Sequence, residues 1–397
     1  MGFRYAYISS TASKDPQFKD YKLATERNEI DFNSAGNEAY NSPIQFHELE
    51  FALSKVGDSA PGPDEICYKM LKKLDVTSKM NLINVINKVW CDKTIPINWK
   101  LAYIIPFLKS GKNPLKAESY RPIALTSCLC KVIERIILNR LVWYISKRPY
   151  IDRFQGGFQK GKSPIECIAS LTKDAKDAFC RKQYLVCVFF DIEKAYDTCW
   201  KHLILKELHN LGLRGNLPLI IKSYLEDRKF KVKVGNTLSE TFDQDMGVPQ
   251  GGVLSCMLFL MVMNSIRNVI GSTEWMGSYS LFVDDLRISY THTDAQKCIS
   301  EVQRAIDKLY EWSIRTGLKF SIEKTEWMVF HRKREDLSPL YQLNLGGHSI
   351  KRVYKKKFLG LILDPKLQWI EHIEYIRGKC LKDMNILRII SKKKPKN

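Results

Sequence analysis

The sequence lacks long apolar runs, paired cysteine motifs and a recognisable leader. No apolar stretch approaches the roughly 20 residues that span a bilayer, and the longest, 257–263, is expected to lie in a helix core. The 11 cysteines are odd in number and irregularly spaced, which favours a reducing, intracellular compartment over a disulfide framework. No Cys-x-x-Cys pair exists, so a zinc site is not expected. The N-terminus has no basic segment followed by an apolar one, so we expect no secretory signal.

Acidic residues are scarce relative to basic ones. Lys plus Arg number 63 against 43 Asp plus Glu, for a net charge of +20. Such an excess favours polyanionic partners through phosphate contacts and counterion release. An anionic membrane surface would satisfy the same charge, but the sequence has no membrane span. A chain of 397 residues can bury a large core and hold two or three subdomains.

Two adjacent aspartates, Asp284 and Asp285, interrupt two apolar segments. Residues 280–283 and 286–290 are expected to be short strands, the second half-buried because apolar and polar residues alternate. A two-residue hairpin turn between them would normally take Asn-Gly or Asp-Gly. Two carboxylates at such a tip repel each other unless a cation lies nearby. The pair therefore indicates a divalent metal site, with a merely polar turn as the alternative.

A further carboxylate, Asp191, follows an apolar run over 184–190. Such a run is typical of a strand buried on both faces, and a charge at its end costs solvation energy unless it is paired or bound to metal. Asp191 could instead cap a helix expected to start over 193–197. Together the carboxylates favour a two-metal site for in-line phosphoryl displacement. Mg²⁺ suits such a site because it binds through few carboxylates and keeps positions for water and phosphate.

Other patterns predict the surrounding elements. Apolar residues at helical spacing predict a helix over 127–144. Ser163, Pro164 and Glu166 predict the start of the next helix, with a capping box. The first 40 or so residues are polar and weakly periodic, so we expect them either to be loosely ordered or to pack late against the rest of the fold.

The second half of the chain also contains residues that indicate where helices and strands begin and end. The segment 246–252 contains glycines that permit close approach of a ligand, with a tight connection onto a core helix as the alternative. An apolar helix is expected from 253 to about 270. Gly317 is expected to end another helix, and a strand is expected over 320–330. The lysine run at 391–396 fits either a nuclear address or a nucleic-acid contact.

The order of motifs is more specific than any one of them. After a basic loop come Ser-Tyr-Arg-Pro-Ile at 119–123, Asp191-x-x-x-Ala195-Tyr196-Asp197, Gly-Val-Pro-Gln-Gly at 247–251, Phe-Val-Asp-Asp at 282–285, Gly317-Leu318 with Lys324-Thr325, and Phe-Leu-Gly at 358–360. This order resembles the reverse transcriptase domain of non-LTR (LINE-type) retrotransposons, most closely jockey-like elements. The resemblance extends over roughly residues 44–373.

The resemblance implies roles for the carboxylates and for the residues that bind nucleotide. Asp191 and Asp284 would ligate two Mg²⁺ ions, with Mn²⁺ as an alternative metal, and Asp285 would support them. Arg121 and Lys109 would bind the incoming triphosphate, Arg121 through its planar guanidinium.

Further implied roles concern the base pair, the sugar and the primer. Tyr196 would exclude the ribose 2′-hydroxyl, with a core aromatic as the alternative. Gln250 and Gly251 would line the nascent base pair. Lys324 would protonate the departing pyrophosphate, with a surface lysine as the alternative. The segment Phe358, Leu359 and Gly360 would form the primer grip, and Leu363-Asp364 would begin the connection to the thumb.

The implied fold is an α+β right-hand polymerase with fingers, a palm built on an antiparallel sheet and a partial thumb. We expect residues 1–42 to be a poorly defined N-terminal extension and 43–180 to be rich in fingers. Residues 181–363 would be rich in palm, and 364–397 would form the partial thumb and basic tail.

The implied activity is RNA-directed DNA polymerisation, with an RNA template, a DNA primer and dNTPs as partners and an endonuclease supplied elsewhere. The oligomeric state and the choice between nucleus and cytoplasm stay open. Four residues depart from the family pattern: Val283 stands for Ala, Gly252 for Ser, Gln159 for Arg and Glu65 for Gly. The last two would weaken template contacts.

Two alternatives remain: a truncated, decayed copy that only binds nucleic acid, and an RNA-dependent RNA polymerase. Tyr196 argues against the RNA polymerase, which needs room for the 2′-hydroxyl.

Overall fold

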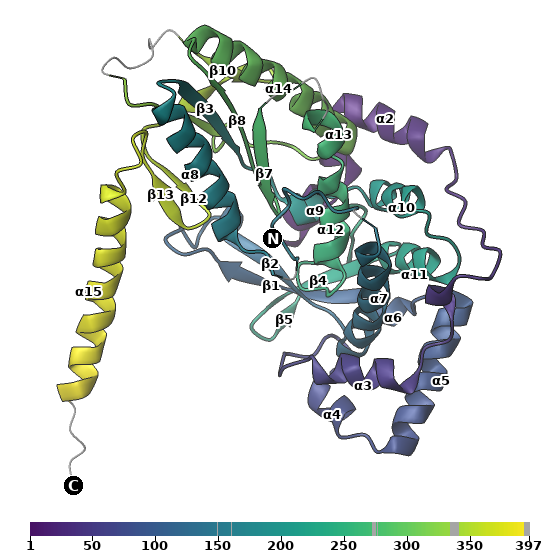
Figure 1. Cartoon of the computed structure of the whole chain (residues 1–397). Coiled ribbons are helices and arrows are strands. Elements are labelled where there is room, and N and C mark those ends of the chain that lie inside the picture. Colours follow the sequence, from purple (N-terminus) through teal and green to yellow (C-terminus); the bar gives the residue numbers. More distant parts are fainter. Residues whose placement is uncertain (149, 160, 272–274, 276, 334–340, 393–397) are drawn as a thin grey trace. The chain divides into compact units, whose positions relative to one another are not determined.

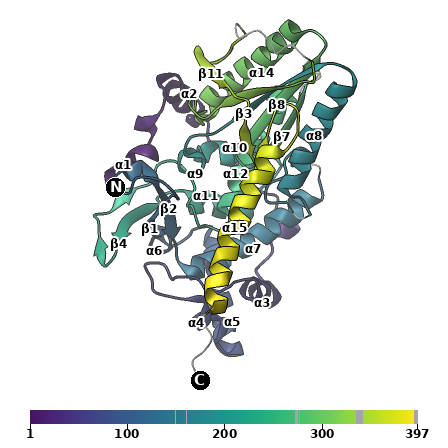
Figure 2. The ribbon, with the colours of Figure 1, turned by 90° about the vertical axis from the view of Figure 1, so that its left-hand side faces the viewer.

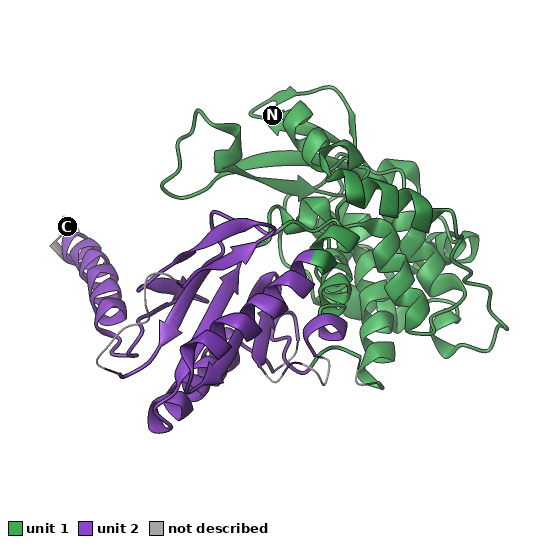
Figure 3. Ribbon diagram, turned by 90° about the horizontal axis from the view of Figure 1, so that it is seen from above, with its two compact units in different colours: residues 1–152, 192–266, 311–319 green, residues 153–191, 267–310, 320–397 purple. Residues whose placement is uncertain are grey.

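The computed structural model describes residues 1–148, 150–159, 161–271, 275, 277–333 and 341–392. It has a mixed α and β fold whose elements are labelled in Figure 1. The chain forms two compact units, coloured in Figure 3. Unit 1 comprises Met1–Asp152, Ile192–Ile266 and Glu311–Lys319; unit 2 comprises Arg153–Asp191, Arg267–Tyr310 and Phe320–Asn397. The predicted lysine tail beyond residue 392 lies outside the described residues.

Unit 1 is largely helical. Its helices are α1 (Gly2–Ile8), α2 (Pro16–Glu26), α3 (Phe46–Ser54), α4 (Tyr68–Lys72), α5 (Val76–Asp92), α6 (Ile97–Lys100), α7 (Cys128–Ser146), α9 (Ala195–Thr198), α10 (Lys201–Asn210), α11 (Asn216–Leu225) and α12 (Ser255–Asn264). Short 3₁₀ turns lie at Thr11–Ser13, Ala39–Asn41 and Ala117–Ser119. The predicted helix over 127–144 is confirmed as α7, whose N-cap Ser127 accepts a hydrogen bond from the Cys130 amide at 3.1 Å.

The first residues are better ordered than the sequence suggested. They contain α1 and α2, and Phe18 of α2 is buried against Trp200 and Met246. Of the two expectations for this segment, loose order was therefore wrong. A single buried aromatic side chain anchors α2, and such an anchor leaves little apolar periodicity in the sequence.

The sheet of unit 1 is small. Its strands are β1 (Leu101–Leu108), β2 (Tyr120–Leu125), β4 (Lys229–Val234), β5 (Thr237–Leu238) and β6 (Phe242–Asp243). β1 pairs antiparallel with β2 and parallel with β4, which also pairs with β5 and β6. The β1–β2 ribbon carries the predicted triphosphate-binding residues.

Unit 2 is built on a six-stranded sheet in the order β10-β11-β9-β3-β8-β7. The strands are β3 (Tyr184–Phe190), β7 (Ser278–Phe282), β8 (Asp285–His292), β9 (Glu326–Phe330), β10 (Leu343–Leu345) and β11 (His348–Arg352). All neighbours are antiparallel except β11 and β9. β3 is central and almost fully buried, as its apolar sequence predicted.

Helices cover both faces of this sheet. Figure 2 shows β3 and β8 between α8 (Pro164–Cys180) and α14 (Ala295–Thr316). Leu171 of α8 packs with Phe189 of β3 and Met328 of β9 in one buried cluster. The rest of unit 2 comprises α13 (Arg267–Ile270), the hairpin β12 (Lys356–Phe358) and β13 (Leu361–Leu363), and α15 (Ile370–Lys392).

Several predicted boundaries shift. Ser163 is the N-cap of α8 and Pro164 its first residue, but the Ser163 side chain makes no capping bond, so the predicted capping box is wrong. The apolar helix expected from 253 to about 270 is divided into α12 and α13. The strand expected over 320–330 begins at Glu326, because residues 322–324 form a turn and the Ser321 amide donates to the Asp191 carbonyl at 2.8 Å.

One other expectation holds. Gly317 follows α14 with a φ of +71°, as expected of a glycine that ends a helix. Among the described residues, no helix combines the length and the apolar character needed to cross a bilayer.

Candidate active site

The three predicted carboxylates lie at one edge of the sheet in unit 2. Asp191 directly follows β3, and Asp285 is the first residue of β8. The antiparallel register pairs Phe190 with Leu286, which brings this end of β3 beside the start of β8. Asp284 lies in the two-residue turn before Asp285. The prediction that both aspartates form the turn is therefore wrong: Val283 and Asp284 form it, and the pairing of Phe282 with Asp285 closes it.

The electrostatics of this edge disfavour ionised carboxylates. Burial raises the pKa of Asp285 to about 6, and the charges of Asp284 and Asp191 add to the increase. Burial also raises the pKa of Asp284, with Asp191 as a further cause. Desolvation is the main cause of both shifts, and the neighbouring carboxylates add to it, so the ionised forms lack full compensation by solvent or positive charge. A divalent cation would supply that compensation.

Asp191 is paired with a lysine in this structure. Its Oδ2 lies 2.9 Å from Nζ of Lys324, and both side chains are partly exposed to solvent. Within the described ranges, no three Cys, His, Asp or Glu side chains form a group that could hold a metal ion. The three carboxylates thus share an edge without forming a closed set of ligands. Their chemistry still fits Mg²⁺, which takes one or two carboxylates and completes its shell with water and phosphate oxygens.

The predicted triphosphate ligands lie together on the β1–β2 ribbon of unit 1. Arg121 is exposed on β2 and pairs in register with Phe107. Lys109 directly follows β1, and its amide bonds to the Ser119 carbonyl at 2.8 Å. Its Nζ donates to the Glu118 carbonyl at 3.1 Å. The ribbon therefore brings together two cations that lie 12 residues apart in the sequence.

Tyr196 is held from one side by α12. Its ring stacks on Phe259, with centroids 5.0 Å apart and an interplanar angle of 22°. Its hydroxyl donates to the Cys256 sulfur at 3.6 Å. Both partners lie on the helix that follows the Pro-Gln-Gly segment. The ring therefore has a fixed direction, as a residue that screens sugars by shape would need.

The Gly-Val-Pro-Gln-Gly segment is bonded to the turn that carries Tyr196. The Val248 amide donates to the Tyr196 carbonyl at 2.8 Å. Gly247 has a φ of +86°, and a Cβ there would lie 2.6 Å from the Asp197 carbonyl oxygen. Only glycine fits this position. Gly251 is similarly constrained: its φ is +131°, and a Cβ there would lie 2.6 Å from the Ala124 carbonyl oxygen.

Gln250 is hydrogen-bonded to Asp197, an acidic residue that the sequence did not single out. Its Nε2 donates to both carboxylate oxygens of Asp197 at 3.2 Å. Burial raises the pKa of Asp197 to about 6, although Lys194 and the Gln250 bond oppose the shift. The carboxylate fixes the Gln250 amide so that its oxygen stays available as an acceptor. Asp197 follows the tyrosine directly in the motif, and that adjacency was the available signal.

Glu134 is a second residue that the sequence analysis missed. It is buried on α7, and its Oε2 accepts bonds from the Val253 amide at 2.7 Å and the Leu254 amide at 3.1 Å. It thereby supports the chain directly after Gly252. A Cβ on Gly252 would lie 2.5 Å from the Tyr224 hydroxyl, so a serine at this position would require the tyrosine side chain to shift. An acid within the apolar stripe of α7 was the sequence signal.

The predicted primer grip is the turn of the β12–β13 hairpin. Phe358 is buried, and its ring lies 5.0 Å from that of Phe189 on β3. Leu359 and Gly360 form the turn, with φ values of +46° and +91°. Lys356 lies at the start of β12, where its Nζ contacts Glu326 at 2.8 Å.

The structure shows the backbone conformation or the hydrogen bond of two residues that depart from the family pattern. Glu65, which stands for glycine, has a φ of +58°, in the region that glycine adopts most readily. Gln159, which stands for arginine, donates to the Gln155 carbonyl.

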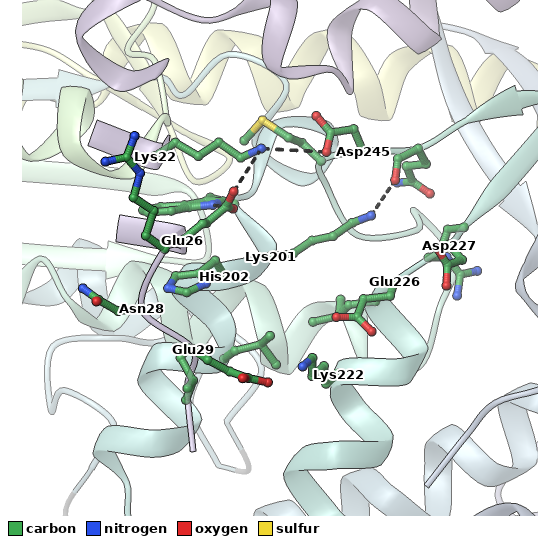
Figure 4. Close-up of a pocket in the computed structure, with 18 of the residues that line it drawn as sticks. Lys22, Glu26, Asn28, Glu29, Lys201, His202, Lys222, Glu226, Asp227 and Asp245 are labelled. Carbon is green, nitrogen blue, oxygen red and sulfur yellow. Dashed lines mark hydrogen bonds and ion pairs between the residues drawn. The ribbon is translucent and has the colours of Figure 1, made fainter. Parts of the chain in front are cut away.

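A separate pocket of about 640 Å³ lies within unit 1. Figure 4 shows that charges of both signs line it, with Lys22 between Glu26 and Asp245 and Lys201 nearby. None of the predicted site residues lines this pocket.

A sheet edge with several carboxylates and too little positive charge suits a metal-dependent phosphoryl-transfer enzyme. Residues 109–363 match the family described as reverse transcriptase (RNA-dependent DNA polymerase). This match covers well over half of the chain, which therefore belongs to the reverse transcriptase family.

Its relatives include proteins of mobile elements. The chain is 31% identical over 360 residues to the probable RNA-directed DNA polymerase from transposon BS of Drosophila melanogaster, covering 89% of this chain and 39% of the relative. It is 30% identical over 340 residues to the RNA-directed DNA polymerase from mobile element jockey of the same species, covering 85% and 37%. A probable RNA-directed DNA polymerase from transposon X-element of that species is 27% identical over 373 residues, covering 91% and 40%. The chain thus spans about two fifths of the length of these relatives.

Proposed function

We propose that this chain is an RNA-directed DNA polymerase that extends a DNA primer with dNTPs on an RNA template. The observation that carries the proposal is the edge of the unit 2 sheet, where Asp191, Asp284 and Asp285 adjoin and burial raises the pKa of the last two. When bound, Mg²⁺ would activate the primer hydroxyl and offset charge on the reacting phosphate. Asp191 and Asp284 would hold it, with support from Asp285.

The chain's own residues would then bind and orient the substrates. Arg121 and Lys109 on the β1–β2 ribbon would bind the triphosphate through charge-assisted hydrogen bonds. Tyr196, fixed by its stacking on Phe259, would exclude the ribose 2′-hydroxyl. Gln250, oriented by Asp197, would contact the nascent base pair.

Two further roles concern the leaving pyrophosphate and the primer strand. Lys324 would donate a proton to the leaving pyrophosphate, a role that requires it to part from Asp191. The turn at Leu359 and Gly360 would contact the primer strand. In this proposal, unit 2 supplies the palm sheet of a right-hand polymerase, and α15 belongs to the thumb.

A primer-extension assay on an RNA template tests the proposal. We expect Mg²⁺-dependent product with dNTPs and little with rNTPs, and a Tyr196→Ala variant should lose about tenfold or more of that preference. Equal use of rNTPs by the unaltered chain would contradict the proposal and favour an RNA polymerase.

A matched pair of variants separates chemistry from binding. Asp284→Asn should abolish extension, whereas Asp383→Asn, an equivalent change on the exposed helix α15, should not. Retained RNA binding without any extension by the unaltered chain would instead favour a copy that only binds nucleic acid.

A further inference from the structure

The turn that carries Asp284 has an unfavourable backbone conformation. Val283 has a φ of +61°, whereas the φ of Asp284 is not positive. This is the pattern of a type II′ turn, in which glycine normally occupies the first position. A β-branched residue there is a genuine outlier. Such conformations persist only where neighbouring groups hold them.

A buried glutamine, Gln155, provides that hold. Its Oε1 accepts hydrogen bonds from the Val283 amide at 3.0 Å and from the Gly157 amide at 2.8 Å. Its Nε2 faces the Val283 carbonyl at 3.5 Å. Gln155 is 0% exposed. One side-chain amide therefore contacts both polar groups of the strained residue.

The segment around Gln155 is itself fixed to the strand before the turn. The Leu281 amide donates to the Phe154 carbonyl at 3.0 Å, and the Gly156 amide donates to the Leu281 carbonyl at 2.8 Å. This is a short parallel pairing centred on Gln155 and Leu281. The Gln155 side chain therefore extends from a rigid base that lies in register with the turn.

Contact between the two backbones leaves room only for glycine at position 157. A Cβ on Gly157 would lie 2.6 Å from both the Val283 amide nitrogen and its Cγ2. On the other side, the Gln155 carbonyl accepts a bond from Lys162 Nζ at 3.1 Å and another from Gln159. The Gln155–Gly157 segment is thus closely packed against the turn and bonded on both sides.

We propose that Gln155 is a positioning residue for the reaction: it holds Val283 in the left-handed conformation and thereby fixes the direction of Asp284. This proposal rests on the proposed polymerase function. An exposed turn that only connected two strands would be more stable with glycine and would need no buried partner. A buried amide that binds a strained residue next to a reactive carboxylate fits preorganisation of that carboxylate.

The test compares Gln155→Met, which keeps the approximate volume but removes both polar groups, with Gln296→Met at an exposed position of α14. Hydrogen exchange of the Val283 amide is measured together with primer extension. We expect exchange to accelerate at least about tenfold and kcat to fall about 10–100-fold, as for other residues that orient metal ligands. The KM for dNTP should change less than about twofold, since substrate contacts remain.

A second variant distinguishes positioning from general stability. Gln155→Met combined with Val283→Gly should recover most of the lost kcat, because glycine adopts positive φ without a partner. Unchanged exchange at Val283 in Gln155→Met, or a kcat that Val283→Gly fails to restore, would overturn the proposal.

An alternative variant and a readout that does not depend on activity complete the test. If Gln155→Met does not fold, Gln155→Glu keeps the acceptor and should keep the Val283 amide protected; rapid exchange there would overturn the proposal. Hydrogen exchange does not depend on activity. An inactive unaltered chain would therefore contradict the polymerase function while the exchange data still decide the role of Gln155.

Discussion

Two hairpins of unit 2 have turns of the same length but different backbone conformations. In the β12–β13 hairpin, Leu359 and Gly360 both have positive φ, the type I′ pattern that matches the twist of the strands. Apart from Gly360 and its two chain neighbours, no atom of the described residues lies within 4 Å of a Cβ built on Gly360. In the β7–β8 hairpin, only the first turn residue, Val283, has positive φ, and the buried side chain of Gln155 contacts it.

The two turns differ in what holds their backbone conformation. The β12–β13 turn contains a glycine and has open space beside it, so its conformation is largely intrinsic. The β7–β8 turn bears Asp284 and depends on a partner from a distant part of the sequence. Strain of this kind clusters at functional sites because surrounding contacts fix a geometry that the local sequence would not adopt.

Loss of a carboxylate from the β7–β8 hairpin should have the greatest effect. Asp284→Asn should lower kcat for primer extension by about a thousandfold or more, because metal stabilisation of the transition state contributes several kcal/mol. Asp285→Asn should have a smaller effect, since Asp285 supports the site less directly. Single-turnover extension measures both. Equal, small losses would remove the distinction that we draw between the carboxylates.

Proline substitutions should break each turn with a different kinetic result. Proline fixes φ near −65° and costs about 3 kcal/mol where that angle is excluded. Val283→Pro should therefore lower kcat about a hundredfold. Leu359→Pro should mainly raise the KM for primer–template. Steady-state kinetics with varied primer–template measures both constants. If both variants changed only kcat, or only KM, the proposed difference between the two turns would be contradicted.

Substitutions that add or remove a side chain in the two turns should have only a small effect on the free energy of unfolding. Gly360→Ala places a Cβ at positive φ and should lower the free energy of unfolding by about 1 kcal/mol. Val283→Gly should not lower it, because relief of strain offsets the lost side chain. Chemical denaturation of both variants checks this. A Val283→Gly chain less stable than Gly360→Ala would argue against strain in the β7–β8 turn.

The smallest effect concerns pH. The pKa of Asp285 is about 6 in the folded chain against an ordinary value of 3.8, chiefly because of burial. The folded state therefore binds this proton more tightly, and ionisation penalises folding increasingly as pH rises from about 4 to about 6. Asp285→Asn should raise the melting temperature by a few degrees at pH 7 and hardly at pH 4. The gain should be modest because the residue as a whole is exposed, so that solvent screens the carboxylate even though neighbouring groups partly desolvate it. The reverse dependence would contradict the charge imbalance at this edge.

Much of the fold could be predicted from patterns that act locally. The apolar run before Asp191 marked the central strand, and the stripe of α7 marked a buried helix. The aspartate pair was found, but its position in the hairpin was off by one residue. Hydrophobic alternation identifies strands without fixing which two residues form the turn.

The remaining site features depend on contacts that no local pattern contains. Gln155 and Val283 are 128 positions apart in the sequence, and Gln250 and Asp197 are 53 apart. The pairing of Asp191 with Lys324 likewise depends on the path of the chain after Gly317. Tertiary contacts decide which polar groups meet, so such residues were found only through the resemblance or missed.

Direct measurement of metal binding tests whether Asp191 and Asp284 hold a metal ion. Mn²⁺ should be titrated into the chain with primer–template and dNTP, and bound ions counted by electron paramagnetic resonance. We predict that the unaltered chain binds Mn²⁺ and that Mg²⁺ displaces it, whereas Asp191→Asn and Asp284→Asn chains bind it at least about tenfold more weakly. Equal binding by all three chains would contradict the assignment of these carboxylates to a metal site.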